Sequence, residues 1–152
     1  MTEASDSINK NDPFNLDRFV SVQATKYDGI CEELRNGKKL THWMWYIFPQ
    51  FDGLGYSPTS KLYAIKSKEE ARQYLEHPVL GTRLLECVQI LLELEGRSAS
   101  QIFGFPDDLK LKSSMTLFAA VQSQELAFAR VLDKYFQGKR DTRTIELLEQ
   151  HP

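Results

Sequence analysis

Apolar residues recur every three or four positions along most of this chain, which is the spacing of an α-helix that packs one face against a core. The first such stretch runs from Phe14 to Leu34. Pro13 suits its first turn, and Gly37 suits the left-handed conformation that ends many helices. The pattern predicts one long helix, with the amide of Gln23 on its apolar face.

The next predicted elements are short. Thr41 is a suitable N-cap for a helix that reaches Phe48, where Pro49 ends it. Residues 50–59 hold two glycines and a proline, and they are predicted to form a loop. A further turn of helix is predicted within residues 57–65.

Capping residues mark the helices of the second half. Ser67 and Glu70 form a predicted capping box, and the helix that follows reaches Glu76, where a His-Pro pair breaks it. Apolar spacing then predicts a second long helix that Gly96 stops. Later helices are predicted at 98–103, from 107 or 108 onward, from Ser123 to Gly138, and at 142–149.

The predicted fold class is all-α, because the alternation typical of strands is scarce. We expect a single compact domain, residues 13–150, with roughly six to eight helices. Long and short helices alternate, which argues against a simple four-helix bundle. Residues 1–12 are predicted to be a disordered lead-in.

Composition narrows the class further. The chain has 152 residues, of which 41% are hydrophobic and 26% charged, and a net charge of −2. These are globular values that give no reason to expect a nucleic-acid groove. No apolar run could span a membrane and no signal peptide is visible, so we expect a cytoplasmic protein. Cys31 and Cys87 fall in apolar helical patterns and are expected to be reduced core residues.

Residues 39–55 read KLTHWMWYIFPQFDGLG, the most unusual stretch of the chain. So many bulky rings beside a Gly-x-Gly turn indicate either a pocket wall or a core. His42 and Trp45 share one face of the predicted helix, and Trp43 lies on another. A flat ring beside a titratable imidazole suits a planar base or sugar, so we favour a site for His42 and Trp45. For Trp43, a core position and a site position are equally open.

A second polar group, DDLKLKSSMT, begins at Asp107. An acidic N-cap would account for Asp107 or Asp108. Three hydroxyls inside a helix are less expected, and a helix start with Lys110 and hydroxyls could hold a phosphate. Before this group, Gly81 is expected to allow close packing at a corner between two helices, from which Arg83 could still reach an anionic ligand.

Metal and cofactor sites are not predicted. The three histidines lack ligand spacing with each other or with the cysteines. Gly53 and Gly55 are too few for a dinucleotide fingerprint, and they follow no predicted strand. The oligomeric state is left open by the sequence.

Five motifs, in order along the chain, resemble one family. They read LDRFVSVQ, GKKLTHWMWYIFPQ, GLGYSPTSKLYAI, EARQYLEHPVLGTRLLE and FGFPDDLKLKSSMTLF. They cover about residues 14–137 and resemble domain-of-unknown-function family 1810, whose members are small, compact all-α proteins without an established reaction. That family is in turn similar to the NADAR proteins, α-helical enzymes of NAD and ADP-ribose metabolism. The Glu-His pair of NADAR helices has no counterpart here except His42 beside Trp43.

These features together predict one pocket, built from the aromatic helix, the Gly-x-Gly loop and the helix of Lys110. The resemblance implies a nucleotide-derived, ADP-ribose-like ligand, which the protein binds or hydrolyses at an N-glycosidic or ADP-ribosyl linkage. Trp45 would stack on a ring, and Lys110 and Arg83 would neutralise phosphate. His42 or Asp107 would act as general acid or base.

The other predicted ligand-binding residues are Gln23, Gln50, Gly53, Gly55, Ser114 and Thr116. The alternative is a non-catalytic interaction module, in which the aromatic strip belongs to the core or faces a partner.

Overall fold

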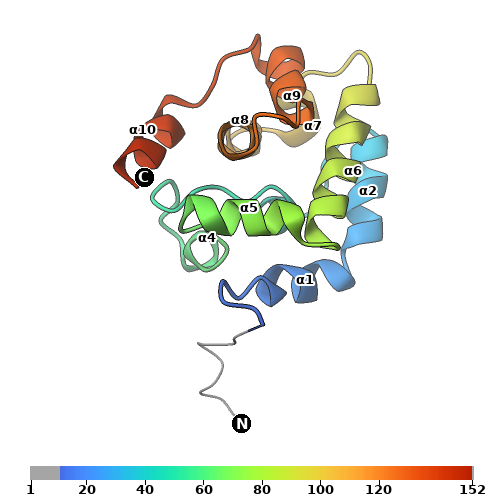
Figure 1. The fold of residues 1–152 in the computed structure, drawn as a ribbon. Helices are drawn as coiled ribbons and strands as arrows, with labels where there is room; N and C mark the ends of the chain where they lie inside the picture. Colours follow the sequence, from blue (N-terminus) through green and yellow to red (C-terminus); the bar gives the residue numbers. More distant parts are fainter. Residues whose placement is uncertain (1–10, 152) are drawn as a thin grey trace.

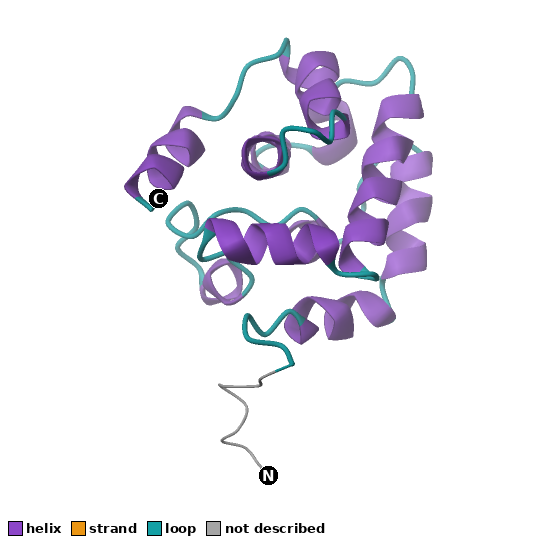
Figure 2. Ribbon diagram, in the orientation of Figure 1, coloured by secondary structure: helices purple, strands orange, loops and turns teal. Residues whose placement is uncertain are grey.

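The computed structural model describes residues 11–151, which contain ten α-helices and no β-strand (Figure 1, Figure 2). The all-α prediction is confirmed, and the helices outnumber the six to eight expected because three of them have only four or five residues. Residues 1–10 of the predicted lead-in lie outside the described residues. The helices are α1 (Asp17–Ala24), α2 (Tyr27–Arg35), α3 (Met44–Ile47), α4 (Pro58–Leu62), α5 (Lys68–Glu76), α6 (Leu80–Glu93), α7 (Ala99–Phe103), α8 (Asp107–Val121), α9 (Ala127–Phe136) and α10 (Thr142–Gln150).

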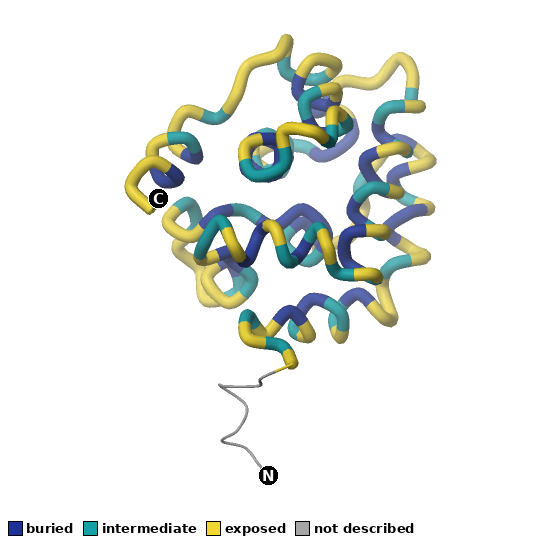
Figure 3. Tube along the Cα trace, viewed as in Figure 1, coloured by how far each residue is buried: buried dark blue, intermediate teal, exposed yellow. Residues whose placement is uncertain are grey.

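Helix α8 lies at the centre of the fold and packs against α9, α5, α7 and α10 (Figure 1). Almost every residue from Leu111 to Ala119 is buried, on all sides of the helix (Figure 3). A helix buried all round has no polar stripe, so its interior hydroxyls need local partners. Ser113 Oγ donates to the carbonyl of Leu109 at 3.1 Å, and Thr116 Oγ1 donates to that of Lys112 at 2.8 Å.

The single helix predicted over residues 14–34 is wrong. The chain forms two helices, α1 and α2, with a break at Thr25 and Lys26. Helix α1 packs against α3 whereas α2 packs against α6, so the chain must change direction between them. Apolar residues on both sides of the break keep helical spacing, and periodicity therefore could not reveal it.

Several predicted helix ends are confirmed. The Ser67 hydroxyl accepts the Glu70 N–H at 3.0 Å at the start of α5, whereas the Glu70 carboxylate binds Arg18 and the Lys66 N–H, so only this half of the predicted capping box forms. Ser98 and Gln101 form a complete capping box at α7. Gly37 follows α2 with a φ of 73°, as its role in ending a helix requires.

The N-caps predicted at Thr41 and Ser123 are wrong. The Thr41 hydroxyl donates to the Glu33 carboxylate at 2.7 Å, before α3 begins. Helix α9 starts beyond Ser123 with no side-chain cap. The predicted place of Pro13 in the first turn is also wrong, because α1 begins at Asp17; the carboxylate of Asp12 accepts the N–H groups of Leu16 and Asp17, at 2.7 and 3.0 Å.

The corner between α5 and α6 has the close packing that the sequence predicts. His77 Nδ1 accepts the N–H groups of Val79 and Leu80, at 3.1 and 3.2 Å, as α6 begins. A Cβ on Gly81 would lie 2.0 Å from the carbonyl oxygen of Leu75. Only glycine therefore allows the two helices to meet at this corner.

Arg18 joins three parts of the chain. Its guanidinium forms an ion pair with Glu70 at 2.7 Å, and both side chains are largely buried. The guanidinium also donates to four carbonyl oxygens, those of Phe14, Asn15, Leu62 and Ala64. Glu70 also accepts the N–H of Lys66 at 2.8 Å. The pair thus ties α1 to the end of α4 and to α5.

The segment between Gln50 and Lys66 is closed at its base as well. Phe51 and Ile65 form an isolated parallel bridge, and the N–H of Ile65 donates to the carbonyl of Gln50 at 2.8 Å. The Arg18 contacts to Leu62 and Ala64 hold the same segment from the other side. This closed segment therefore has a fixed position on the core.

We expect Arg18→Met to lower the free energy of unfolding by about 3–5 kcal/mol, because the Glu70 carboxylate would remain buried without its partner. Urea denaturation at neutral pH measures the loss. The matched control is Arg72→Met, which removes an exposed pair with Glu69 at 3.5 Å and should cost less than about 1 kcal/mol. Similar losses for both variants would contradict a central role for Arg18.

Candidate functional site

The two tryptophans of the aromatic segment have different positions. Trp43 is buried in the core with Met44, Ile47 and Phe48. Its Nε1 donates to the Glu33 carboxylate at 2.8 Å. Trp45 is only partly buried and lies in the wall of a cleft. The structure thus resolves the two readings of Trp43 in favour of the core.

Glu33 holds the chain that leads into the aromatic segment. Its carboxylate accepts hydrogen bonds from Trp43 Nε1, from the N–H groups of Leu40 and Thr41, and from the Thr41 hydroxyl. Burial alone would raise the pKa of Glu33, but these hydrogen bonds outweigh it and lower the pKa to about 2. The ionised form is therefore the one that stabilises this connection.

The cleft, which we call the α3–α8 cleft, has a volume of about 380 Å³. It lies between α3, the closed segment that includes α4, and the first two turns of α8. Its lining residues are Trp45, Gln50, Leu54, Gly55, Tyr56, Ser57, Ser60, Pro106, Leu109, Lys110 and Ser113. Four of the residues predicted from the sequence, Trp45, Gln50, Gly55 and Lys110, thus line one cleft.

Charge in the cleft is carried by Lys110. Its Nζ lies 4.5 Å from the centre of the Trp45 ring and 3.0 Å from the carboxylate of Asp107. Asp107 also pairs with Lys39 at 2.8 Å, and the Lys39 side chain is 7% exposed. Two ammonium groups and one carboxylate leave this triad with one positive charge.

Asp107 is held in its ionised form. Burial alone would raise the pKa of Asp107, but hydrogen bonds from Lys39 and Lys110 outweigh that effect and hold the pKa below its usual range. A carboxylate that two ammonium groups already stabilise is a weak base and a poor proton donor at neutral pH.

The indole nitrogen of Trp45 is a second unusual group. Its N–H is buried and has no acceptor among the described residues. Buried indole N–H groups normally have a hydrogen-bond partner. The Trp45 ring therefore combines a cation over its face with an unused donor at its edge.

The opposite wall is built by close contact across the closed segment. A Cβ on Gly55 would lie 2.4 Å from the hydroxyl of Ser60, so only glycine fits there. The Ser60 hydroxyl donates to the carbonyl of Ser57, and the Ser57 hydroxyl accepts the N–H of Ser60. Tyr56 is 85% exposed at the rim of this wall.

A sequence profile described as "Protein of unknown function (DUF1810)" matches residues 13–148. The chain belongs to the DUF1810 family. A solved structure with the same fold is that of the conserved hypothetical protein Rv1873 from Mycobacterium tuberculosis. It is 52% identical, the match covers 91% of this chain and 99% of that one, and the TM-score is 0.89. Among curated proteins, none matches the chain.

Two other predicted residues, Gln23 and Arg83, meet behind α3. Gln23 is fully buried, and its Nε2 donates to the carbonyl of Tyr46 at 2.6 Å and to the Tyr74 hydroxyl at 3.2 Å. Arg83 Nη1 donates to Gln23 Oε1 at 3.3 Å. These contacts explain the amide on an apolar face, since they position the backbone of α3 next to Trp45.

The remaining predicted residues lie away from the cleft lining. His42 is exposed ahead of α3. Gly53 packs close to Leu147 of α10. Thr116 Oγ1 accepts the N–H of Asp141 at 2.9 Å, and Ser114 is buried with a hydroxyl that has no partner among the described residues. The structure therefore does not bring these four to the cleft.

Several lining residues were not predicted from the sequence, among them Tyr56, Ser57 and Ser60. An aromatic residue directly after a Gly-x-Gly turn was a usable signal for Tyr56. Ser57 is the N-cap of α4 and Ser60 lies within that helix, and their place at the cleft could not be found without the fold.

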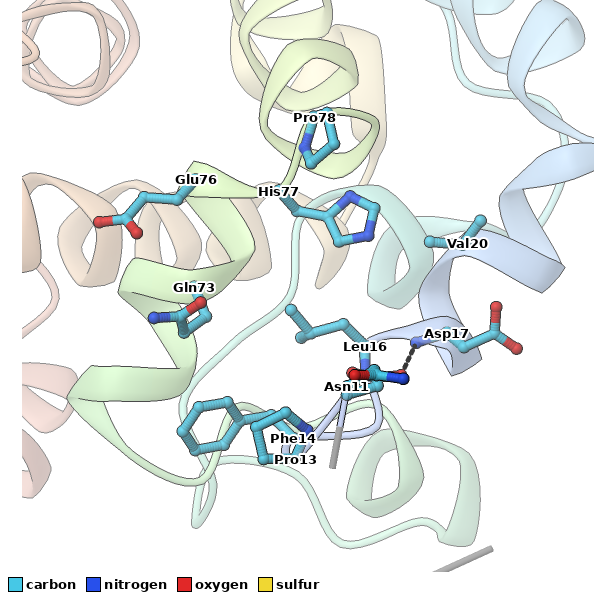
Figure 4. Close-up of a pocket in the computed structure, with 11 residues that line it drawn as sticks. Asn11, Pro13, Phe14, Leu16, Asp17, Val20, Gln73, Glu76, His77 and Pro78 are labelled. Carbon is cyan, nitrogen blue, oxygen red and sulfur yellow. Dashed lines mark hydrogen bonds between the residues drawn. The ribbon is translucent and has the colours of Figure 1, made fainter. Parts of the chain in front are cut away.

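A larger hollow of about 420 Å³ lies between α1 and α5, and its lining includes Phe14, Leu16, Val20 and His77 (Figure 4). The His77 Nδ1 is already occupied as an acceptor at the start of α6.

The described residues contain no group of three or more potential metal ligands among histidine, cysteine and acidic side chains. Within the described part of the chain, no helix is long and apolar enough to cross a membrane.

Glu33→Gln should remove a pH-dependent part of the stability. Because the pKa of Glu33 is lower in the folded state, the ionised group stabilises the fold above its unfolded pKa of about 4.3. We expect the wild type to exceed the variant by about 1 kcal/mol near pH 7, after allowance for solvent screening.

That advantage should shrink as the pH falls from about 4 to about 2. Urea denaturation of both proteins across this range measures it. A difference that stays constant from pH 7 to pH 2 would show that the charge of Glu33 is not the cause.

Trp43→Ala should destabilise the protein by about 3–5 kcal/mol, the usual cost of deleting a core aromatic ring. Trp45→Ala should cost clearly less, because its ring is partly exposed and lines a cleft. Thermal and urea denaturation of the two variants compare them. Equal and large losses would place both rings in the core and remove the main wall of the α3–α8 cleft.

Proposed function

We propose that the α3–α8 cleft binds a small anionic ligand with a planar ring, of the nucleotide-derived, ADP-ribose-like class. The observation that carries this proposal is the position of Lys110, whose ammonium lies in the cleft wall over the Trp45 ring. One wall thereby offers a cation and an aromatic surface together, which suits a phosphate attached to a nucleoside.

The size and polarity of the cleft support this ligand class. A volume of about 380 Å³ lies in the range of small-molecule sites. Gln50 supplies an amide that can both donate and accept, and Ser57 and Ser60 supply hydroxyls on the opposite wall. The exposed ring of Tyr56 offers a second surface for stacking.

Binding, rather than hydrolysis, is the function that these residues support. His42, one of the predicted acid–base residues, does not line the cleft. Asp107, the other, is held as a carboxylate by Lys39 and Lys110. A hydrolytic step at neutral pH would need a proton donor or acceptor with a pKa nearer to 7.

A second candidate function is an interaction module. Exposed apolar side chains at and beside the cleft favour this function. Phe105 is 78% exposed, and Tyr56 and Leu109 are exposed as well. Exposed apolar groups that cluster on a surface often mark a site for a partner.

The test is a thermal-shift and calorimetry panel of ADP-ribose, NAD, nucleosides and nucleotide sugars. We expect a phosphate-bearing member to raise the melting temperature of the wild type. Lys110→Ala should weaken binding by about ten-fold or more, equivalent to about 1.4 kcal/mol. Lys112→Ala is the matched control, because Lys112 lies on the same helix but outside the cleft lining, and it should bind like the wild type.

Two further outcomes separate the alternatives. His42→Ala should leave binding unchanged, since His42 lies outside the lining. If no member of the panel stabilises the wild type at millimolar concentration, the interaction module becomes the better explanation of the exposed aromatic rim.

A further inference from the structure

A third cavity, separate from the α3–α8 cleft, lies between α2 and α6 and has a volume of about 420 Å³. Tyr27, Cys31 and Arg35 line one side of it. They are spaced four residues apart on α2, so they form a single stripe along that helix. From α6, Glu86 and Gln89 face them. A thiol thus lies between a phenol and a guanidinium, in a space open to small molecules.

A second thiol lies directly behind the first. Cys87, on α6, is fully buried, Cys31 is 5% exposed, and the two thiols lie close enough for each to shift the pKa of the other. Both cysteines are free. The two helices that carry them pack against each other, so the pair bridges two elements of the core. Cys31 therefore lines the cavity, whereas Cys87 is fully buried and does not line it.

The surroundings of the pair give the two sulfurs different chemistry. Hydrogen bonds from Cys87 and Tyr27 and the charge of Arg35 outweigh burial and lower the pKa of Cys31 to about 6. The hydrogen bond with Cys31, together with burial, raises the pKa of Cys87. Cys31, which also lines the cavity, is therefore the thiol of the pair that favours the thiolate form, and the buried Cys87 is the thiol that favours the protonated form.

We propose that Cys31 and Cys87 are a redox-active dithiol, in which a small hydroperoxide entering the α2–α6 cavity oxidises Cys31 and Cys87 then closes a disulfide. Nothing in the α3–α8 cleft is needed for this chemistry. The dithiol proposal and the proposed ligand binding in the α3–α8 cleft can therefore be tested independently.

The reaction balances in two steps. The Cys31 thiolate attacks the outer oxygen of the hydroperoxide, the O–O bond breaks, and the leaving alkoxide or hydroxide takes a proton, which gives a sulfenic acid on Cys31. The Cys87 thiol then attacks that sulfur, an S–S bond forms, and the S–O bond breaks with release of water. An external dithiol returns both cysteines to the reduced form.

The cavity favours a neutral oxidant. The Glu86 carboxylate, which accepts a hydrogen bond from the Tyr27 hydroxyl, would repel an anion near Cys31. Burial, together with this hydrogen bond to Glu86, raises the pKa of Tyr27, so the phenol stays protonated as a donor. Hydrogen peroxide and small organic hydroperoxides are neutral at physiological pH and fit the space available.

The experiment treats the folded wild type with hydrogen peroxide near stoichiometric concentration, then blocks the remaining thiols under denaturing conditions and measures intact mass. The reference is the same protein unfolded in urea, which gives the reactivity of its unperturbed cysteines. We expect the folded protein to lose both thiols together, as a disulfide, about ten-fold or more faster than the unfolded chain. Peptide mapping should place that disulfide between Cys31 and Cys87.

Two variants assign the roles. Cys87→Ser should accumulate a sulfenic acid on Cys31 that dimedone traps, and Cys31→Ser should leave Cys87 reduced. Circular dichroism establishes that each variant is folded. If one of the variants does not fold, the intact mass and the peptide map of the oxidised wild type still test the proposal. Two free thiols in the peroxide-treated folded wild type, or oxidation no faster than in urea, would overturn it.

Arg35 provides a matched pair of substitutions. Arg35→Gln should slow oxidation of Cys31 several-fold, because the positive charge beside the thiolate is lost. Arg130→Gln, at an exposed arginine on α9, should leave the rate unchanged. Equal rates for both variants would show that Arg35 does not activate Cys31, and would overturn the assignment of Cys31 as an activated thiol.

Discussion

The ion pair between Arg18 and Glu70 is the interaction on which the arrangement of the site depends. It connects α1 to α5, and through the carbonyls of Leu62 and Ala64 it also fixes the end of the closed segment. That segment carries one wall of the α3–α8 cleft. A buried guanidinium with a full set of acceptors has one stable geometry, and this geometry is passed on to the loop. The cleft is therefore positioned by a contact that lies outside it.

The aromatic segment shows how one short helix can serve both core and surface. Helix α3 has only four residues, and it contacts α1 on one side and α8 on another. Trp43 and Trp45 are two positions apart and so point in different directions. One ring is enclosed by the core and satisfied by Glu33, and the other is left beside Lys110. Residue type alone could not separate the two roles, because both are tryptophan.

Features that depend on residues close in the sequence could be predicted, whereas features that depend on contacts between distant residues could not. Ser67 and Ser98 were identifiable as caps because a cap depends on neighbours three residues away. The break at Thr25 was not identifiable, because it follows from the different partners of α1 and α2. At the cleft, Trp45, Gln50, Gly55 and Lys110 stood out by their unusual context. Ser60 did not, because its place there depends on contact with Gly55 across the loop.

Asp107 is shared by two lysines, and this sharing affects how the cleft can exchange its contents. In a simple ion pair, a lysine that turned toward a ligand would leave a half-buried carboxylate without a counter-charge. Here Lys39, whose side chain is buried, would still pair with Asp107 if Lys110 turned toward a ligand. Lys110 could therefore change partners while Asp107 keeps a counter-charge. Of the two lysines, Lys110 is the more exposed, and it is the one that can contact a ligand without leaving Asp107 unpaired.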